Sequence, residues 1–213
     1  MSTIKNILVN KDSSCPSIWF MRQAGRYLPE FKKIRLKNKN FINLCLNSEL
    51  SSEITLQPIK RYNLDSAIIF SDILLIPYAL GQNVKFIKDK GPILSEFNIN
   101  EFLKNNRENF SSKLKPIYQA IKKTRRNLKK EKSLISFIGA PWTLLVYMFG
   151  LKKNKNEINL LKFKNKKNEL NKIMDSLIKY SCLHIENQIE AGADLVQIFD
   201  SWAGLLPDND LEN

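Results

Sequence analysis

Residues 192–206 read GADLVQIFDSWAGLL, and the order of residue types in this stretch decides the fold. Gly192 follows a long pattern of apolar residues at helical spacing, so it stands where a helix usually ends. Residues 195–199, LVQIF, form a short apolar run typical of a buried strand. Asp200 and Ser201 come directly after this run. Helix, glycine cap, buried strand and polar strand end together indicate one repeat of an α/β protein.

Earlier parts of the chain show the same order of features. Each predicted strand is followed by polar or glycine-rich residues, and parallel strands joined by helices bring such ends to the edge of the sheet where active sites lie. The predicted strands are residues 18–21, followed by Arg22, 67–70, followed by Ser71 and Asp72, and 134–138, followed by GAPWT. The predicted helices are 48–62, with Ser48 or Ser52 as cap and Pro58 as a kink or boundary, 100–130, divided at Pro116, and 169–191.

Four strand–helix repeats predict either a four-stranded open sheet or the first half of a (β/α)₈ barrel, which needs roughly 250 residues when complete. We expect the class to be α/β, of the (β/α)₈ TIM-barrel family, with about the first half of the barrel present. Residues 1–213 then form a single domain, the N-terminal portion of that barrel. Half a barrel exposes two sheet edges, which favours aggregation or loose folding.

Composition narrows the class of protein. The net charge of +13 indicates a solvated basic surface or the steering of an anionic ligand. Nucleic acid is a weaker interpretation, because no aromatic residues alternate with the lysines and no DNA- or RNA-binding motif occurs. Three widely spaced cysteines favour reduced thiols over disulfides or zinc. Residues 137–151 are too short to span a membrane and residues 1–14 lack a signal-peptide core, so we expect a cytoplasmic protein.

Residues 21–30, MRQAGRYLPE, place Arg22 and Arg26 four residues apart around Ala24 and Gly25. Arginine grips carboxylates with two parallel hydrogen bonds, so the pair indicates a ligand with several carboxylates. The alternative is two solvated arginines on one helix face, which Gly25 and Pro29 make less favourable.

Four segments together resemble the uroporphyrinogen decarboxylase family: IWFMRQAGRYLPEFKKIR at 18–35, AIIFSDILLIPYALG at 67–81, FIGAPWTLLVYM at 137–148 and the stretch at 192–206. The resemblance implies removal of carbon dioxide from the four acetates of uroporphyrinogen III, giving coproporphyrinogen III. It implies no cofactor and no metal, a tetrapyrrole as partner, no nucleic acid or membrane, and a homodimer when full length. Family members are longer, and their active-site histidine has no counterpart here. His184, the one histidine of the chain, is expected to be a helix-packing or surface residue and not a catalytic one.

The resemblance also implies roles for particular residues. Asp72 is the expected catalytic anion that stabilises a cationic pyrrole, although a helix cap is its alternative role. Arg22 is a candidate proton donor, but arginine is a poor acid at pH 7, and water or a substrate carboxyl is equally suitable. The expected substrate-binding residues are Arg22, Gln23, Arg26, Phe31, Asp72, Tyr147 and Ser201. The alternative role of Tyr147 is packing in the core, and Asp200 could equally anchor a neighbouring loop. Trp142 and Trp202 are expected to be structural and not to stack on substrate.

Two other functions compete with the decarboxylase. One is a zinc-dependent corrinoid or thiol methyltransferase of the same fold, whose His/Cys ligands would lie beyond residue 213. The other is an inactive, truncated relative that folds poorly or binds porphyrinogen without turnover. The intact MRQAGRY and FSDIL segments favour the decarboxylase.

Overall fold

The computed structural model describes residues 3–11, 17–24, 27–87, 90–154, 157–158, 163 and 166–206. The chain divides into two compact units. The first comprises Met1–Asp72, Lys113–Phe137 and Ile185–Gln197, and the second comprises Ile73–Ser112, Ile138–His184 and Ile198–Asn213.

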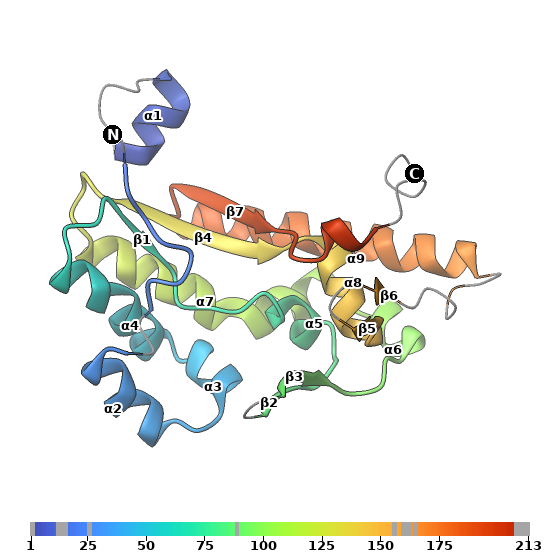
Figure 1. Cartoon of the computed structure of the whole chain (residues 1–213). Helices are drawn as coiled ribbons and strands as arrows, with labels where there is room; N and C mark the ends of the chain where they lie inside the picture. The colour runs from blue at the N-terminus through green and yellow to red at the C-terminus, as the bar shows by residue number, and fades with distance from the viewer. Residues whose placement is uncertain are drawn as a thin grey trace. The chain divides into compact units, whose positions relative to one another are not determined.

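Most of a parallel sheet lies in the first unit (Figure 1). Its strands are β1 (Ser66–Ile68), β4 (Ser133–Gly139) and β7 (Leu195–Phe199), in the order β1-β4-β7. β1 pairs in parallel with β4, and Ser66 lies opposite Ser133. Almost all of β4 is buried, as is typical of a parallel strand covered on both faces. The predicted strands at 67–70, 134–138 and 195–199 are therefore confirmed, and so is the α/β class with a parallel sheet.

The predicted strand at residues 18–21 is wrong. In the described chain this segment belongs to no sheet, Met21 lies in a turn, and Ile18, Phe20 and Met21 are each more than half exposed. Its backbone bonds instead to the residue before β1: the N–H of Ile18 donates to Asp65 Oδ2 at 2.7 Å, and the Ile18 carbonyl accepts the N–H of Asp65 at 3.1 Å. A short apolar run forms a strand only where a neighbouring strand pairs with it and its side chains are buried, and neither condition holds here.

The helices of the first unit are α1 (Thr3–Asn10), α2 (Pro29–Lys37), α3 (Phe41–Cys45), α4 (Ser48–Arg61) and the larger part of α7 (Arg107–Asn127). The predicted helix at 48–62 is confirmed as α4, but its cap is Asn47. The Asn47 side chain accepts the N–H groups of Glu49 and Leu50. Pro58 lies inside the helix, which continues to Arg61.

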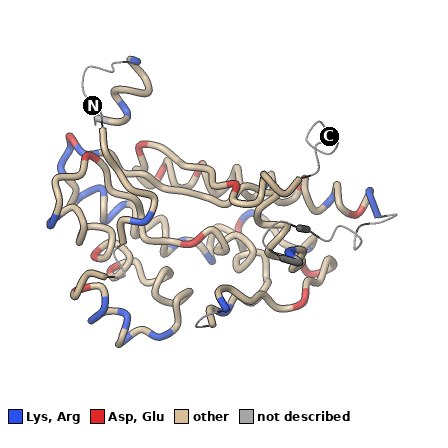
Figure 2. The backbone as a smooth tube through the Cα atoms, in the orientation of Figure 1, with Lys and Arg blue, Asp and Glu red and all other residues tan. Residues whose placement is uncertain are grey.

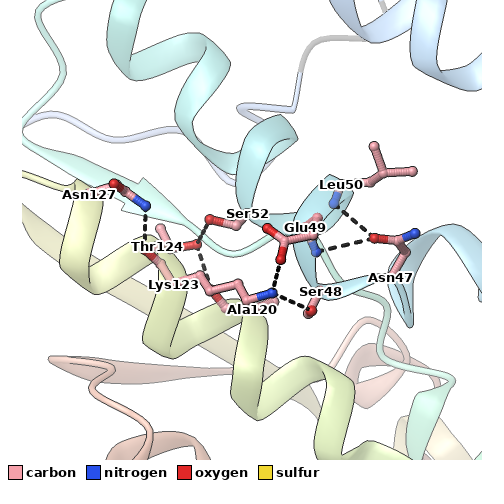
Figure 3. Close-up of polar contacts among 9 residues, drawn as sticks. All are labelled: Asn47, Ser48, Glu49, Leu50, Ser52, Ala120, Lys123, Thr124 and Asn127. Atoms are coloured by element: carbon pink, nitrogen blue, oxygen red, sulfur yellow. Dashed lines mark hydrogen bonds and ion pairs between the residues drawn. The ribbon is translucent and has the colours of Figure 1, made fainter.

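Polar side chains join α4 to α7 (Figure 3). The Thr124 hydroxyl of α7 is hydrogen-bonded to the Ser52 hydroxyl of α4 at 3.0 Å. Lys123 donates to Ser48 Oγ at 3.0 Å and forms an ion pair with Glu49. Ser48 and Ser52, which the sequence suggested as caps, therefore act across the helix pair instead.

The helical region predicted at 100–130 is divided, but not at Pro116. α6 (Ile99–Leu103) ends before α7 begins at Arg107, and Pro116 lies inside α7. Asparagines mark the starts of both helices. Asn98 caps α6, and the Asn106 side chain accepts the N–H of Asn109 at the start of α7.

The second unit holds α5 (Leu75–Ala79), α6, α8 (Pro141–Phe149), most of α9 (Lys167–Glu190), the short helix η2 (Ala203–Leu205) and two antiparallel pairs. These pairs are β2 (Val84–Ile87) with β3 (Gly91–Leu94), and β5 (Lys152–Asn154) with β6 (Glu157–Ile158). The apolar region 137–151 is a strand end followed by α8. Within the described residues, no helix has the length and apolar character needed to cross a membrane.

The helix predicted at 169–191 is confirmed as α9. Gly192 follows it with a φ of 108°, and its N–H bonds to the carbonyl of Ile189 at 2.9 Å. This left-handed conformation favours glycine, so the predicted cap is confirmed.

Charge is spread along the chain rather than concentrated in one element. Figure 2 shows Lys and Arg on α2, α7 and α9, with Asp and Glu among them. This distribution favours the solvated surface over a single basic patch.

Candidate functional site

Helix α4 fixes the backbone at the carboxyl end of β1 in the first unit. The Ser51 hydroxyl donates to the carbonyl of Phe70 at 2.6 Å, and the N–H of Phe70 donates to Thr55 Oγ1 at 2.8 Å. All three residues are buried, where an unpaired backbone group is unfavourable. Two hydroxyls of α4 therefore position the chain two residues before Asp72.

Asp72 is half-buried beyond this anchored point. Burial raises the pKa of the Cys45 thiol well above its usual value, and the nearby Asp72 carboxylate raises this pKa further, whereas Arg35 lowers it. α5 begins at Leu75, and its cap residue is Leu74, with no side-chain cap. Neither Ser71 nor Asp72 is therefore the N-cap residue of α5, which removes one structural alternative for Asp72.

Phe31 lies beside the same strand end. Its ring packs edge-on against Phe70, with centroids 5.9 Å apart, and Phe41 packs on Phe70 in the same way at 5.7 Å. Because Phe31 is buried, its role in the structure is to pack against the strand end. Its expected contact with substrate stays a prediction.

Gln23 ties the segment that carries Arg22 to the start of β1. Its side-chain amide donates to the carbonyl of Ser66 at 3.0 Å, and its Oε1 accepts the N–H of Phe20 at 2.9 Å. Gln23 is buried, whereas Arg22 is exposed in a turn. Substrate binding by both residues stays a prediction, and Arg26 lies outside the described residues.

The second unit builds a polar junction between α8 and the residues after β7. The buried Thr143 hydroxyl donates to Asp200 Oδ1 at 2.6 Å and accepts the N–H of Trp202 at 3.1 Å. Trp142 Nε1 donates to the carbonyl of Trp202 at 2.9 Å. Asp200 therefore has the anchoring role that the sequence left open, and Trp142 is structural, as expected.

Tyr147 is half-buried on α8, and its ring centroid lies 5.8 Å from that of Trp202. Both residues line a pocket of about 680 Å³ in the second unit. Ser201 is exposed beside Trp202 in the chain but is not among the lining residues. The structure thus places Tyr147 in a cavity and leaves the substrate contact of both hydroxyls a prediction.

Two lysines that sequence reasoning did not select also line this pocket, Lys90 and Lys152. Lys152 Nζ lies 4.3 Å from the ring centroid of Trp202, close enough for a cation–π interaction. The sequence signal was a Lys/Asn-rich run, which is more often a solvated surface. The sequence pattern does not select Lys152, whereas its position over Trp202 in the fold does.

His184 is fully buried in α9, with its ring centroid 6.3 Å from that of Phe110. Burial lowers the pKa of its imidazole from 6.5 to about 3, so the ring is neutral at pH 7. Of the two expected roles, packing and surface, the structure shows packing. Across the described residues, no group of three or more His, Cys, Asp or Glu side chains could hold a metal ion.

Known proteins with similar sequences indicate the family of this chain. A family model described as uroporphyrinogen decarboxylase (URO-D) matches residues 1–213. Uroporphyrinogen decarboxylase from Rickettsia felis is 44% identical over 207 residues, covering 97% of this chain and 60% of the relative. The protein of the same name from Orientia tsutsugamushi is 46% identical over 215 residues, covering 97% and 60%. The chain therefore spans about 60% of the length of these curated relatives.

A solved structure, a methyltransferase from Methanosarcina mazei, has a TM-score of 0.63 and 18% sequence identity. The match covers 84% of this chain and 53% of that protein. A likeness at this identity bears on fold alone and carries no argument about reaction or substrate.

Proposed function

The chain belongs to the uroporphyrinogen decarboxylase family, and from this membership we propose that its protein removes carbon dioxide from the four acetate side chains of uroporphyrinogen III. The product is coproporphyrinogen III, and the reaction needs no cofactor. The match of the family model along residues 1–213 is the observation that carries the proposal. It also supports one domain over this range, the N-terminal portion of a (β/α)₈ barrel.

The proposed chemistry follows from the substrate. Protonation of a pyrrole carbon beside the acetate makes the ring cationic. The C–C bond to the carboxylate then breaks, carbon dioxide leaves, and the bonding electrons neutralise the ring. A second proton completes the methyl group, while the first leaves the ring carbon. Because the substrate accepts the electrons itself, the protein has to supply binding, orientation and electrostatic stabilisation.

We assign Asp72 to the stabilisation of this cation. A fixed carboxylate near developing positive charge contributes about 3–4 kcal/mol to the transition state. The anchoring of Phe70 by Ser51 and Thr55 supports this role, because preorganised groups need no rearrangement during reaction. The proton comes from Arg22, from water or from a substrate carboxyl.

Arg22, Gln23, Arg26, Phe31, Tyr147 and Ser201 are the residues that we propose for substrate binding. The arginines suit carboxylates through paired hydrogen bonds, and the hydroxyls of Tyr147 and Ser201 supply single donors. We also propose a cytoplasmic homodimer for the whole protein, and light scattering after gel filtration would reveal a monomer if this is wrong.

Asp72→Asn tests the function. The assay follows coproporphyrinogen formation by chromatography after oxidation to the coloured porphyrins. We expect the variant to lose at least about a hundredfold in kcat, because a neutral amide cannot stabilise the cation. Asp175→Asn, an exposed change on α9, is the matched control and should keep its activity. Both variants are made in the whole protein. Undiminished turnover by Asp72→Asn would refute the role of this carboxylate, and no turnover by the unaltered whole protein would refute the decarboxylase.

A further inference from the structure

The pocket that contains Tyr147, here called the Tyr147 pocket, combines an apolar wall with basic groups. Its volume of about 680 Å³ is within the range of small-molecule sites. Residues of β3 and the segment after it form one side, and the end of α8 forms another. The lining residues are Lys90, Pro92–Phe97, Val146–Gly150, Lys152 and Trp202.

Aromatic side chains supply much of the wall. Phe97 and Phe149 pack together with their ring centroids 4.4 Å apart, and Tyr147 lies against Trp202. Phe97, Tyr147 and Trp202 are each half-buried, so part of each side chain is accessible. A wall of this kind suits the face of a flat, electron-rich ring.

Lys152 adds a localised positive charge beside this wall. The Trp202 ring restricts its ammonium group, which lies 4.3 Å from the ring centroid. Among the described side chains, Lys152 has no carboxylate partner. An ammonium has three N–H donors and a ring occupies one side of it, so donors stay available to an anion in the pocket.

The charges that line the pocket favour an anionic ligand. Lys90 and Lys152 carry positive charge, and within the part of the chain that the structure describes, Glu96 is the one carboxylate that lines the pocket. All three are exposed at the surface of the described chain, so a ligand reaches them without rearrangement of the core. The excess of one positive charge predicts that a carboxylate enters more readily than a cation.

We propose that Lys152, assisted by Lys90, binds a carboxylate of the tetrapyrrole substrate in the Tyr147 pocket, with the attached pyrrole ring against the aromatic wall. This inference rests on the proposed function and deepens it, because it adds specificity residues outside the arginine segment. Each part of the ligand has a partner in the pocket. The pyrrole ring packs against the aromatic wall, and the carboxylate that the ring carries binds Lys152.

Equilibrium binding of uroporphyrin, the fluorescent oxidised octacarboxylate, tests the proposal without any need for turnover. We expect Lys152→Gln to weaken binding about tenfold, the effect of losing one charge-assisted hydrogen bond. Lys90→Gln should weaken it less. Lys179→Gln is the matched control, since Lys179 is also exposed and lies over an aromatic ring, Tyr180 at 5.6 Å, but does not line the pocket.

Glu96→Gln provides a test of opposite sign. Removing the carboxylate that lines the pocket should tighten uroporphyrin binding, whereas a nonspecific loss of structure would weaken it. Unchanged thermal unfolding of each variant confirms that the fold is intact. Equal affinities of the unaltered protein and Lys152→Gln would overturn the proposal, as would an equal loss in Lys179→Gln or no binding at all.

The decarboxylase and the Lys152 site fail in different ways. If uroporphyrin binding depends on Lys152 while no coproporphyrinogen forms from uroporphyrinogen, the inference holds and the proposed reaction is wrong. If turnover is normal and Lys152→Gln changes neither the affinity for uroporphyrin nor KM, the reaction holds and the inference is wrong. A rise in KM without a fall in kcat is the kinetic result that we expect for Lys152→Gln.

Discussion

His184 should make the folded state less stable as the pH falls below neutrality. Burial lowers its pKa from 6.5 to about 3 in the folded protein. In the unfolded chain the imidazole takes up a proton below about pH 6.5, whereas the folded protein has to keep it neutral. Stability is therefore fully present above pH 6.5, declines as the pH falls, and levels off only near pH 3.

The magnitude follows from these two values. Each unit of pH below the unfolded pKa corresponds to about 1.4 kcal/mol, so the free energy of unfolding should fall by about 2 kcal/mol between pH 7 and pH 5. Ordinary Asp and Glu side chains titrate mostly below this range, so His184 dominates the change. A loss of this size is a large fraction of a typical domain's stability.

Denaturant unfolding at pH 7, 6 and 5 measures the effect. His184→Leu should be nearly independent of pH over this range, whatever its absolute stability. Cys182→Ser, an exposed change on the same helix, should keep the dependence of the unaltered protein. Because the chain has one histidine, its imidazole resonance can also be followed alone by NMR. An imidazole that titrates near pH 6.5 in the folded protein, or equal pH dependences for His184→Leu and the unaltered protein, would refute the reasoning.

Two further substitutions test local features of the fold. Gly192→Ala should lower stability by about 1–2 kcal/mol in thermal unfolding, because φ is 108° and a Cβ would lie 3.2 Å from Cγ of Arg125; Gly204→Ala, with nothing within 4 Å of its Cβ, is the control and should be near neutral. Thr143→Val should cost about 1–2 kcal/mol, since it removes the buried hydroxyl that donates to Asp200, and Thr143→Ser should restore most of this loss. Equal melting temperatures within either pair would contradict the corresponding interpretation.

Local sequence determined the elements whose signals need no distant partner. The runs at 67–70, 134–138 and 195–199 are short, mostly apolar and followed by polar residues or glycine, and each overlaps a strand. The helical spacing of 169–191 and the glycine after it likewise predicted α9 and its end. The spacing of apolar residues and the position of a glycine affect structure within a few residues, so both signals can be read from the local sequence.

Other features depended on which distant residues meet. Residues 18–21 are as apolar as a strand, yet Ile18 bonds to the backbone and the side chain of Asp65, and no described strand pairs with this segment. Side-chain caps set the helix starts at Asn47 and Asn106, whereas Pro58 and Pro116, which the sequence suggested as boundaries, lie inside helices. Where local signals for a strand, a cap or a helix boundary competed, tertiary packing determined which structure formed.

The candidate site divides in the same way. The family motifs in the sequence selected Asp72 and Tyr147, and their residue types suggested the chemistry. Tertiary structure alone decided that Ser51 and Thr55 anchor the strand end before Asp72, and that Lys152 lies over Trp202 beside Tyr147. The physical reason is that a side chain's type is local, whereas its partners, burial and charge environment come from segments far away in the chain.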